Sequence, residues 1–379
     1  MSQIELRPGL ADVPVAESAV SFIDGKRARL EYRGIAVETL ARESSFEETA
    51  YLLLKGDLPT QRQLADFDDQ LRHHRRIKYK LKDLIKCLPE TGHPMYALQA
   101  TVAAMGMFYP ARDVSNAQSN WESCIRLIAK MPTVVAAFHR IRSGDEPIDP
   151  RDDLDHAANF YYMIFEREPS PAIRKVIDAC LIVHAEHTMN ASTFSGRVTA
   201  STLANPYTVI SAAIGTLTGP LHGGANEEVL DMLDEIGTEA NVKAWVEDAI
   251  KTKKKIMGYG HRVYKVKDPR ATVLQELAEH VFAETGRPTQ YDMAVKMEGI
   301  MAEKLGSKGI YPNVDFYSGI VYQSLGLPRD LFTPIFAVAR VAGWLAHWLE
   351  QLVGNKIFRP EQIYVGKTDA NYVPLSQRP

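Results

Sequence analysis

The chain has 379 residues, of which 45% are hydrophobic and 24% charged, the balance of an ordinary globular protein. Its formal net charge of -3 argues against bulk attraction to nucleic acid. Three cysteines lie far apart without a CxxC pair, which argues against a disulfide framework or zinc ribbon and fits a reducing cytoplasm. No stretch has the ~18 uninterrupted apolar residues of a membrane span. The start, MSQIELRPGL, lacks a signal-peptide pattern, so we expect a cytoplasmic enzyme.

Strand signals are confined to the N-terminal part. Residues 20–33 alternate and carry Asp24-Gly25, which predicts a small β-hairpin. Ser45 with Glu48 predicts a capping box that opens a helix ending at Gly56. Helical spacing of apolar residues then predicts one or two helices over 64–88, and further helices over 95–108, 121–141, 154–165, 171–188, 207–217, 225–236, 239–253, 271–284, 290–305 and 314–325.

The last helix is apolar nearly all round, which predicts that it is buried. Thr333 is expected to cap it, with Pro334 at its first position and Gly354 at its end. Together the patterns predict an all-α protein with a small N-terminal hairpin. The glycine-rich stretch 219–224 and the turn 326–328 predict a smaller helical domain over 220–325, and a large domain over 1–219 and 326–379.

His222 stands alone between small residues, directly before a polar helical pattern. The start of a helix presents free N–H groups and a positive dipole end, which favour a neutral imidazole. A neutral imidazole can donate a hydrogen bond to a substrate oxygen. The alternative is a histidine satisfied by the backbone. His261 follows Gly258-Tyr259-Gly260, which is no GxGxxG motif and follows no strand, so it indicates a structural turn or a site residue.

Charged residues at helix starts give two further candidates. Arg270 follows Asp268 at the N-cap and Pro269, where the helix dipole opposes a cation. It is either an exposed arginine or one held there for an anion. Asp315 lies in the first turn of a helix capped by Asn313. It either pairs with the dipole or serves as a general base.

Arg340 lies on the apolar last helix, without an acid three or four positions away. A buried guanidinium needs an anionic partner, either a distant carboxylate or a ligand. His184 and His187 have helical spacing, but a metal pair there lacks a third ligand. We expect His184 in the core and His187 at the open end of the 171–188 helix. The lysines at 251 and 253–255 indicate a solvated face or a phosphate-bearing ligand.

Taken together and in order, these motifs resemble the citrate synthase family over nearly the whole chain. The resemblance implies an almost all-α fold whose large and small domains close over the active site. The short length resembles the small homodimeric bacterial and archaeal form. The motifs are the His187 segment, Gly-Pro-Leu-His222-Gly, Gly-Tyr-Gly-His261, Asp-Pro-Arg270, Pro-Asn-Val-Asp315, Ala-Arg340 and Arg359-Pro360, with Ile23-Asp24-Gly25 and Tyr32-Arg33-Gly34 before them.

The resemblance implies that acetyl-CoA condenses with oxaloacetate and water to give citrate and coenzyme A. Asp315 would remove the methyl proton, neutral His222 would donate to the thioester oxygen, and His261 would polarise and protonate the keto oxygen. It implies no metal and no cofactor beyond the coenzyme A thioester, and a homodimer in which Arg359 reaches the partner's site. The implied oxaloacetate contacts are His187, Arg270, Arg340, Arg359 and Arg72, and the implied coenzyme A contacts are Lys255, Ile256, Met257, Gly258, Tyr259 and Lys265.

Three alternatives stay open from the sequence. The first is 2-methylcitrate synthase, which uses propionyl-CoA with the same catalytic groups, alone or alongside the acetyl-CoA reaction. One methylene in an apolar pocket discriminates by only ~1–3 kcal/mol, and the sequence does not identify that pocket. The second is a non-catalytic helical scaffold, which leaves Arg340 unexplained. The third is a metal hydrolase, which chelators would inhibit.

Overall fold

The computed structural model describes residues 5–10, 12–111 and 113–379. The segment used for the signal-peptide prediction therefore lies partly outside the described residues. The strands are β1 (Ser21–Asp24), β2 (Arg29–Tyr32) and β3 (Ile35–Ala36). The helices are α1 (Val37–Glu43), α2 (Phe46–Lys55), α3 (Gln61–His74), α4 (Tyr79–Lys86), α5 (Pro94–Phe108), α6 (Ala117–Arg142), α7 (His156–Phe165), α8 (Pro171–His184), α9 (Ala191–Ser201), α10 (Pro206–Leu217), α11 (Ala225–Ile236), α12 (Val242–Thr252), α13 (Pro269–Thr285), α14 (Thr289–Leu305), α15 (Val314–Ser324) and α16 (Phe332–Leu352).

The predicted hairpin is confirmed and extended by one strand. β1 and β2 pair antiparallel with Ser21 opposite Tyr32. β3 then pairs with β2 across a two-residue turn, Arg33-Gly34, in which both residues have positive φ, 50° and 85°. That is the geometry of a type I′ turn, whose twist suits a hairpin. At two residues, β3 is too short to show an alternating pattern in the sequence.

The predicted all-α architecture is also confirmed, but α1 and α9 were not predicted, and the end of α8 and the start of α16 differ from the prediction. α8 ends at His184 and not at 188. The carbonyl of His184 accepts a hydrogen bond from Arg340 Nε at 2.6 Å, and that of Ala185 accepts one from the Gly343 N–H at 3.2 Å. Both carbonyls therefore accept hydrogen bonds from α16 and not from a continued α8.

α9 was not predicted, because its small polar sequence lacks apolar spacing. Asn190 caps it by accepting a hydrogen bond from the Thr193 N–H at 3.1 Å.

The start of α16 also differs from the prediction. The helix begins at Phe332 with Leu331 at the N-cap, so Thr333 does not cap it. The Thr333 hydroxyl donates to Glu227 Oε1 at 2.6 Å instead, and so links α16 to α11. The prediction that α16 is buried is confirmed, since Trp344 and Trp348 are 2% and 1% exposed.

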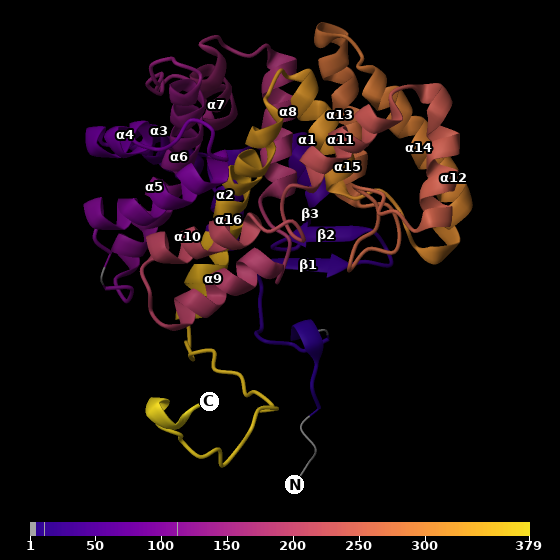
Figure 1. Ribbon diagram of the computed structural model, residues 1–379. Helices are drawn as coiled ribbons and strands as arrows, with labels where there is room; N and C mark the ends of the chain where they lie inside the picture. The colour runs from indigo at the N-terminus through magenta and orange to yellow at the C-terminus, as the bar shows by residue number, and fades with distance from the viewer. Residues whose placement is uncertain (1–4, 11, 112) are drawn as a thin grey trace.

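α16 occupies the centre of the fold. It packs on α2, α6, α8, α9 and α10 (Figure 1). α11 to α15 pack on one another in a group that meets α1, α8 and α16, while the C-terminal tail extends from the body. The domain boundaries predicted at 219/220 and 325/326 stay a prediction. In the part of the chain that the structure describes, no helix is long and apolar enough to cross a bilayer.

Candidate active site

Two histidines predicted from separate motifs lie side by side. His187 follows α8, and His261 lies in the loop between α12 and α13. Their ring centroids are 5.1 Å apart, and the ring of Tyr264 lies 4.7 Å from His261 and 5.7 Å from His187. Burial, and then Arg270, lowers the pKa of His187 well below its ordinary value and that of His261 to about 4. Both imidazoles are therefore neutral at pH 7.

Hydrogen bonds fix which nitrogen of His222 and His261 carries the proton. The Ser192 N–H donates to His222 Nε2 at 3.2 Å. The N–H groups of Val263 and Tyr264 donate to His261 Nδ1 at 3.0 and 3.1 Å. A backbone N–H only donates, so the contacted nitrogens are acceptors. The remaining hydrogen is on Nδ1 of His222 and on Nε2 of His261, where each is available to a ligand.

The neutral state predicted for His222 has a different structural cause from the one expected. α11, the helix that follows, has Gly224 at its N-cap. The helix start that contacts the imidazole belongs to α9, through Ser192 in its first turn. Burial, and then Arg340, lowers the pKa of His222 to about 4. A positive helix end therefore favours the neutral form of His222. This end belongs to α9, a helix that was not predicted.

Arg270 is buried, 3% exposed, at the start of α13. The predicted N-cap is confirmed: Asp268 Oδ1 accepts from the Arg270 N–H at 3.0 Å. The same carboxylate binds the guanidinium bidentately, Nε–Oδ1 at 3.0 Å and Nη2–Oδ2 at 2.7 Å. Asp268 therefore offsets the opposing helix dipole. Burial disfavours the charge, yet Asp268 outweighs it and raises the pKa of Arg270.

Arg340 has no carboxylate partner within 4.0 Å among the described residues, although it is 1% exposed. Its Nε donates to the carbonyl of His184, and its guanidinium carbon lies 4.5 Å from the centroid of the Phe336 ring. Burial lowers its pKa to about 10, so it is charged at pH 7. Its two terminal amino groups make no hydrogen bond within the described parts of the chain. A planar carboxylate can bind such a group bidentately.

Asp315, in the first turn of α15, forms a cluster with His187, His261 and Arg270. The predicted cap of α15 is confirmed, because the Asp315 N–H donates to Asn313 Oδ1 at 3.0 Å. Burial raises its pKa to about 6, against the lowering effect of Arg270. The carboxylate is thus ionised at pH 7 but close to its pKa, as a general base requires. Because Arg270 acts on the pKa values of Asp315, His187 and His261, these four groups share one electrostatic environment.

The loop before His261 is fixed against α15. The Asn313 N–H donates to the Gly258 carbonyl at 2.9 Å, and the Gly260 N–H donates to the Tyr311 carbonyl at 2.9 Å. Gly258 has a φ of 73°, and a Cβ there would come within 2.9 Å of Phe316 Cα. Only glycine fits both the conformation and the contact. The loop therefore ties His261 to α15, the helix that carries Asp315.

Comparison with known proteins decides the family. The family model "Citrate synthase, C-terminal domain" matches residues 9–361. The chain belongs to the citrate synthase family. A citrate synthase of Synechocystis is 59% identical over 98% of this chain and 94% of that relative, and one of Acidithiobacillus ferridurans is 50% identical over 100% of both.

Solved citrate synthases share the fold. The structure from Pyrobaculum aerophilum has a TM-score of 0.92 and 43% identity, over 98% of this chain and 95% of that one. The structure from Thermoplasma acidophilum has a TM-score of 0.93 and 34% identity, over 99% and 100%, and is a ternary complex with carboxymethyl coenzyme A and oxaloacetate. Membership of the citrate synthase family and the mainly helical fold are therefore both confirmed.

Two predicted citrate synthase site residues lie away from the cluster. Arg72 lines a separate cavity of about 720 Å³, where it binds Asp68 at 2.8 Å and the Asp152 carbonyl at 2.8 Å. Arg359 is exposed in the C-terminal tail. The structure thus gives no support for a substrate contact of Arg72, and Arg359 does not join the cluster of its own chain. The contacts predicted for both stay predictions.

The predicted coenzyme A segment, residues 255–259 with Lys265, lies beside the cluster in the same loop, and its ligand contacts stay a prediction. The Lys265 N–H donates to the Gly25 carbonyl at 2.9 Å, which joins this loop to the N-terminal hairpin. Tyr259 packs edge-on against Phe316, with ring centroids 4.7 Å apart. Within the described ranges, no group of three or more His, Cys, Asp or Glu side chains is placed to hold a metal ion.

Proposed function

We propose that the chain condenses acetyl-CoA with oxaloacetate and water to give citrate and coenzyme A. The observation that carries the proposal is the grouping, around the buried Arg270 and Arg340, of a carboxylate with a raised pKa and two neutral imidazoles whose free N–H groups are assigned. Family membership supports the same reaction. A thioester methyl is a weak acid, so its deprotonation needs a base and a hydrogen-bond donor acting together.

In this proposal Asp315 takes the methyl proton while His222 Nδ1–H donates to the thioester oxygen as the enol forms. The enol carbon attacks the keto carbon of oxaloacetate, and His261 Nε2–H polarises and then protonates the keto oxygen. Arg270, Arg340 and His187 hold the substrate carboxylates and keto group. Water then hydrolyses the citryl thioester. Closure of helices α11 to α15 over the site would exclude water until the carbon–carbon bond forms.

The alternative acyl substrate is propionyl-CoA, which would give 2-methylcitrate with the same groups. Steady-state rates with both thioesters test the proposal against this alternative. A kcat/KM at least as high with acetyl-CoA supports citrate synthesis as the main activity. A strong preference for propionyl-CoA would instead assign the chain to 2-methylcitrate synthesis, and activity with neither would reject a condensing enzyme.

The pH dependence follows from Asp315. Its pKa is about 6 because burial disfavours the charged form, so it is protonated below that pH and cannot accept the methyl proton. We expect kcat to fall about tenfold for each pH unit below 6, and to be level from pH 7 to 8. Initial rates at saturating substrates measure this. A rate that is unchanged at pH 5 in folded protein would contradict the role of Asp315.

We also propose a homodimer in which Arg359 enters the partner's site. The exposed tail that carries Arg359 leaves the body of the protein (Figure 1). It presents apolar side chains such as Ile357 and Val365, 65% and 92% exposed, which a second copy would cover. Family resemblance supports the same arrangement.

Mixing two inactive variants tests this arrangement. In a heterodimer of Arg359→Ala and Asp315→Asn chains, an arginine donated by the partner leaves one site intact. We therefore expect activity to return to up to about a quarter of the wild-type rate, when random reassortment makes half of the dimers mixed and each has one working site. If Arg359 serves its own chain, both sites stay defective and no activity returns. A monomer by sedimentation would also contradict the proposal.

A further inference from the structure

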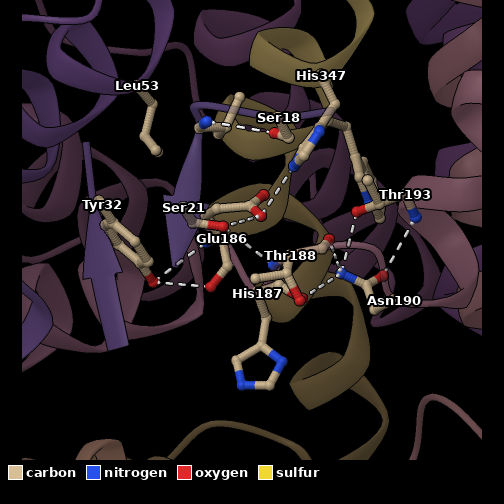
Figure 2. Close-up of polar contacts among 12 residues, drawn as sticks. Ser18, Ser21, Tyr32, Leu53, Glu186, His187, Thr188, Asn190, Thr193 and His347 are labelled. Carbon is tan, nitrogen blue, oxygen red and sulfur yellow. Dashed lines mark hydrogen bonds and ion pairs between the residues drawn. The ribbon is translucent and has the colours of Figure 1, made fainter. Parts of the chain in front are cut away.

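The residue before His187 is a completely buried carboxylate. Glu186 Oε1 accepts hydrogen bonds from Ser21 Oγ and His347 Nε2, each at 2.9 Å. Oε2 has no hydrogen-bond partner in the described residues, and a Cβ on Gly343 would come within 2.3 Å of it. Figure 2 shows the carboxylate facing Ser21 and His347, while the imidazole of His187 points the opposite way. A buried carboxylate with so few partners needs a counter-charge.

His347 does not supply that charge. Arg197 Nη1 lies 3.2 Å from His347 Nδ1, and a guanidinium can only donate. His347 Nδ1 is therefore an acceptor, and the single ring hydrogen is on Nε2, which donates to Glu186. Arg197 in turn is paired with Glu350 at 2.7 Å. The hydrogen-bond partners of Glu186 are thus neutral, and the charge of Arg197 is already matched.

Two further arginines feel the charge of this carboxylate: Arg33, on which Glu350 acts more strongly, and the buried Arg340, on which Glu186 acts most strongly. The Nε of Arg340 donates to the carbonyl of His184, two residues before Glu186. Gly343, three residues after Arg340 on α16, packs on Glu186 Oε2. Burial lowers the pKa of Arg340, and Glu186 is the leading group that opposes this shift. For Glu186 itself burial opposes ionisation, but the hydrogen bonds from His347 and Ser21 and the charge of Arg340 outweigh it and lower its pKa.

The connection that carries Glu186 and His187 is held rigidly. The Tyr32 hydroxyl bonds both the carbonyl of Glu186, at 2.9 Å, and its N–H, at 3.2 Å. The Thr188 N–H donates to Ser21 Oγ at 3.2 Å, and Thr188 has a φ of 50°, which is strained for a β-branched residue. His187 Nε2 is buried without a partner in the described residues. The position of the buried charge relative to the substrate site is therefore fixed.

We propose that Glu186 is a resident counter-charge for Arg340, which keeps this guanidinium in place while the site is empty and limits how tightly carboxylate ligands bind. A substrate or product carboxylate that binds Arg340 must share its positive potential with Glu186. Removing the charge of Glu186 should therefore strengthen carboxylate binding and destabilise the empty protein. This inference rests on the proposed function, since it takes oxaloacetate and citrate as the ligands.

The test measures the dissociation constants of oxaloacetate and citrate by calorimetry at pH 7, with the thermal midpoint of the ligand-free protein. Glu186→Gln removes the charge and keeps the shape; we expect binding tighter on the order of tenfold and a lower midpoint. Ser21→Ala removes one donor to Glu186 but keeps the charge, and serves as the matched control. We expect it to leave binding unchanged or weaker. A purely structural role would make both variants bind more weakly.

A second charge variant covers the case in which Glu186→Gln does not fold. Ser21→Lys, at a half-buried position on β1, places an ammonium group beside the carboxylate. It should tighten oxaloacetate binding in the same direction. Binding that is unchanged or weaker in the folded charge variants would overturn the inference. Wild-type citrate formation is measured alongside: its absence would reject the proposed function, whereas its presence with no tightening rejects only the role of Glu186.

Discussion

Replacing Asp315 with Asn should lower kcat for citrate formation by on the order of a thousandfold, the usual range for loss of a general base. The amide has nearly the same shape as the carboxylate, so the cap by Asn313 and the start of α15 should persist. It cannot accept a proton from the thioester methyl. Burial of the charged carboxylate has a free-energy cost, which is why the pKa of Asp315 is raised. The neutral amide avoids this cost, so the folded variant should be at least as stable as the wild type.

Release of the free thiol from acetyl-CoA plus oxaloacetate measures this effect. Asp292→Asn is the matched control, because Asp292 on α14 is half-buried and pairs with Arg287 at 2.7 Å. The same chemical change there should leave kcat within about twofold, since a solvent-accessible ion pair contributes little. An Asp315→Asn protein that is folded and retains the wild-type kcat would remove the general base from the account.

Replacing His222 with Ala should lower kcat by on the order of a hundredfold to a thousandfold, the range for loss of one oxyanion donor. The hydrogen-bonded Nε2 leaves Nδ1–H as the group that meets the developing enolate oxygen. Because the imidazole is neutral and its ring only partly enclosed, the KM values should change less than kcat.

Ser192→Ala separates the backbone contact from the hydroxyl contact. The backbone N–H of residue 192 is kept, while the hydroxyl, 2.8 Å from His222 Nε2, is lost. We expect a loss of about tenfold or less, because the N–H alone keeps Nε2 an acceptor. A loss equal to that of His222→Ala would show that the hydroxyl fixes the imidazole. Retention of the wild-type kcat by His222→Ala would eliminate its role as a donor.

Local patterns predicted the parts of the site whose structure is local. The caps at Asp268 and Asn313 placed Arg270 and Asp315 at helix starts, and both caps are present. The bidentate pair of Asp268 with Arg270 was missed, although the two-residue spacing was visible. Tyr264 was missed too; its place three residues after His261 in one glycine loop was the available signal.

Contacts between distant segments could not be predicted from one sequence. His222 meets Ser192 through α9, a helix without apolar spacing, and α8 ends early because Arg340 takes a carbonyl that is 156 positions away. The Glu186 network likewise joins β1, the connection after α8, and α16. Each of these depends on tertiary packing, which overrides local helix signals.

In the proposed reaction Asp315, His222 and His261 together deprotonate acetyl-CoA and join its methyl carbon to oxaloacetate. The most direct test of this reaction is to incubate the purified protein with methyl-labelled acetyl-CoA and oxaloacetate, and to quantify labelled citrate and free coenzyme A in the same sample. The account predicts equal amounts of the two, and a loss of both products in Asp315→Asn. Thiol release without labelled citrate, or no product from folded wild-type protein, would contradict it.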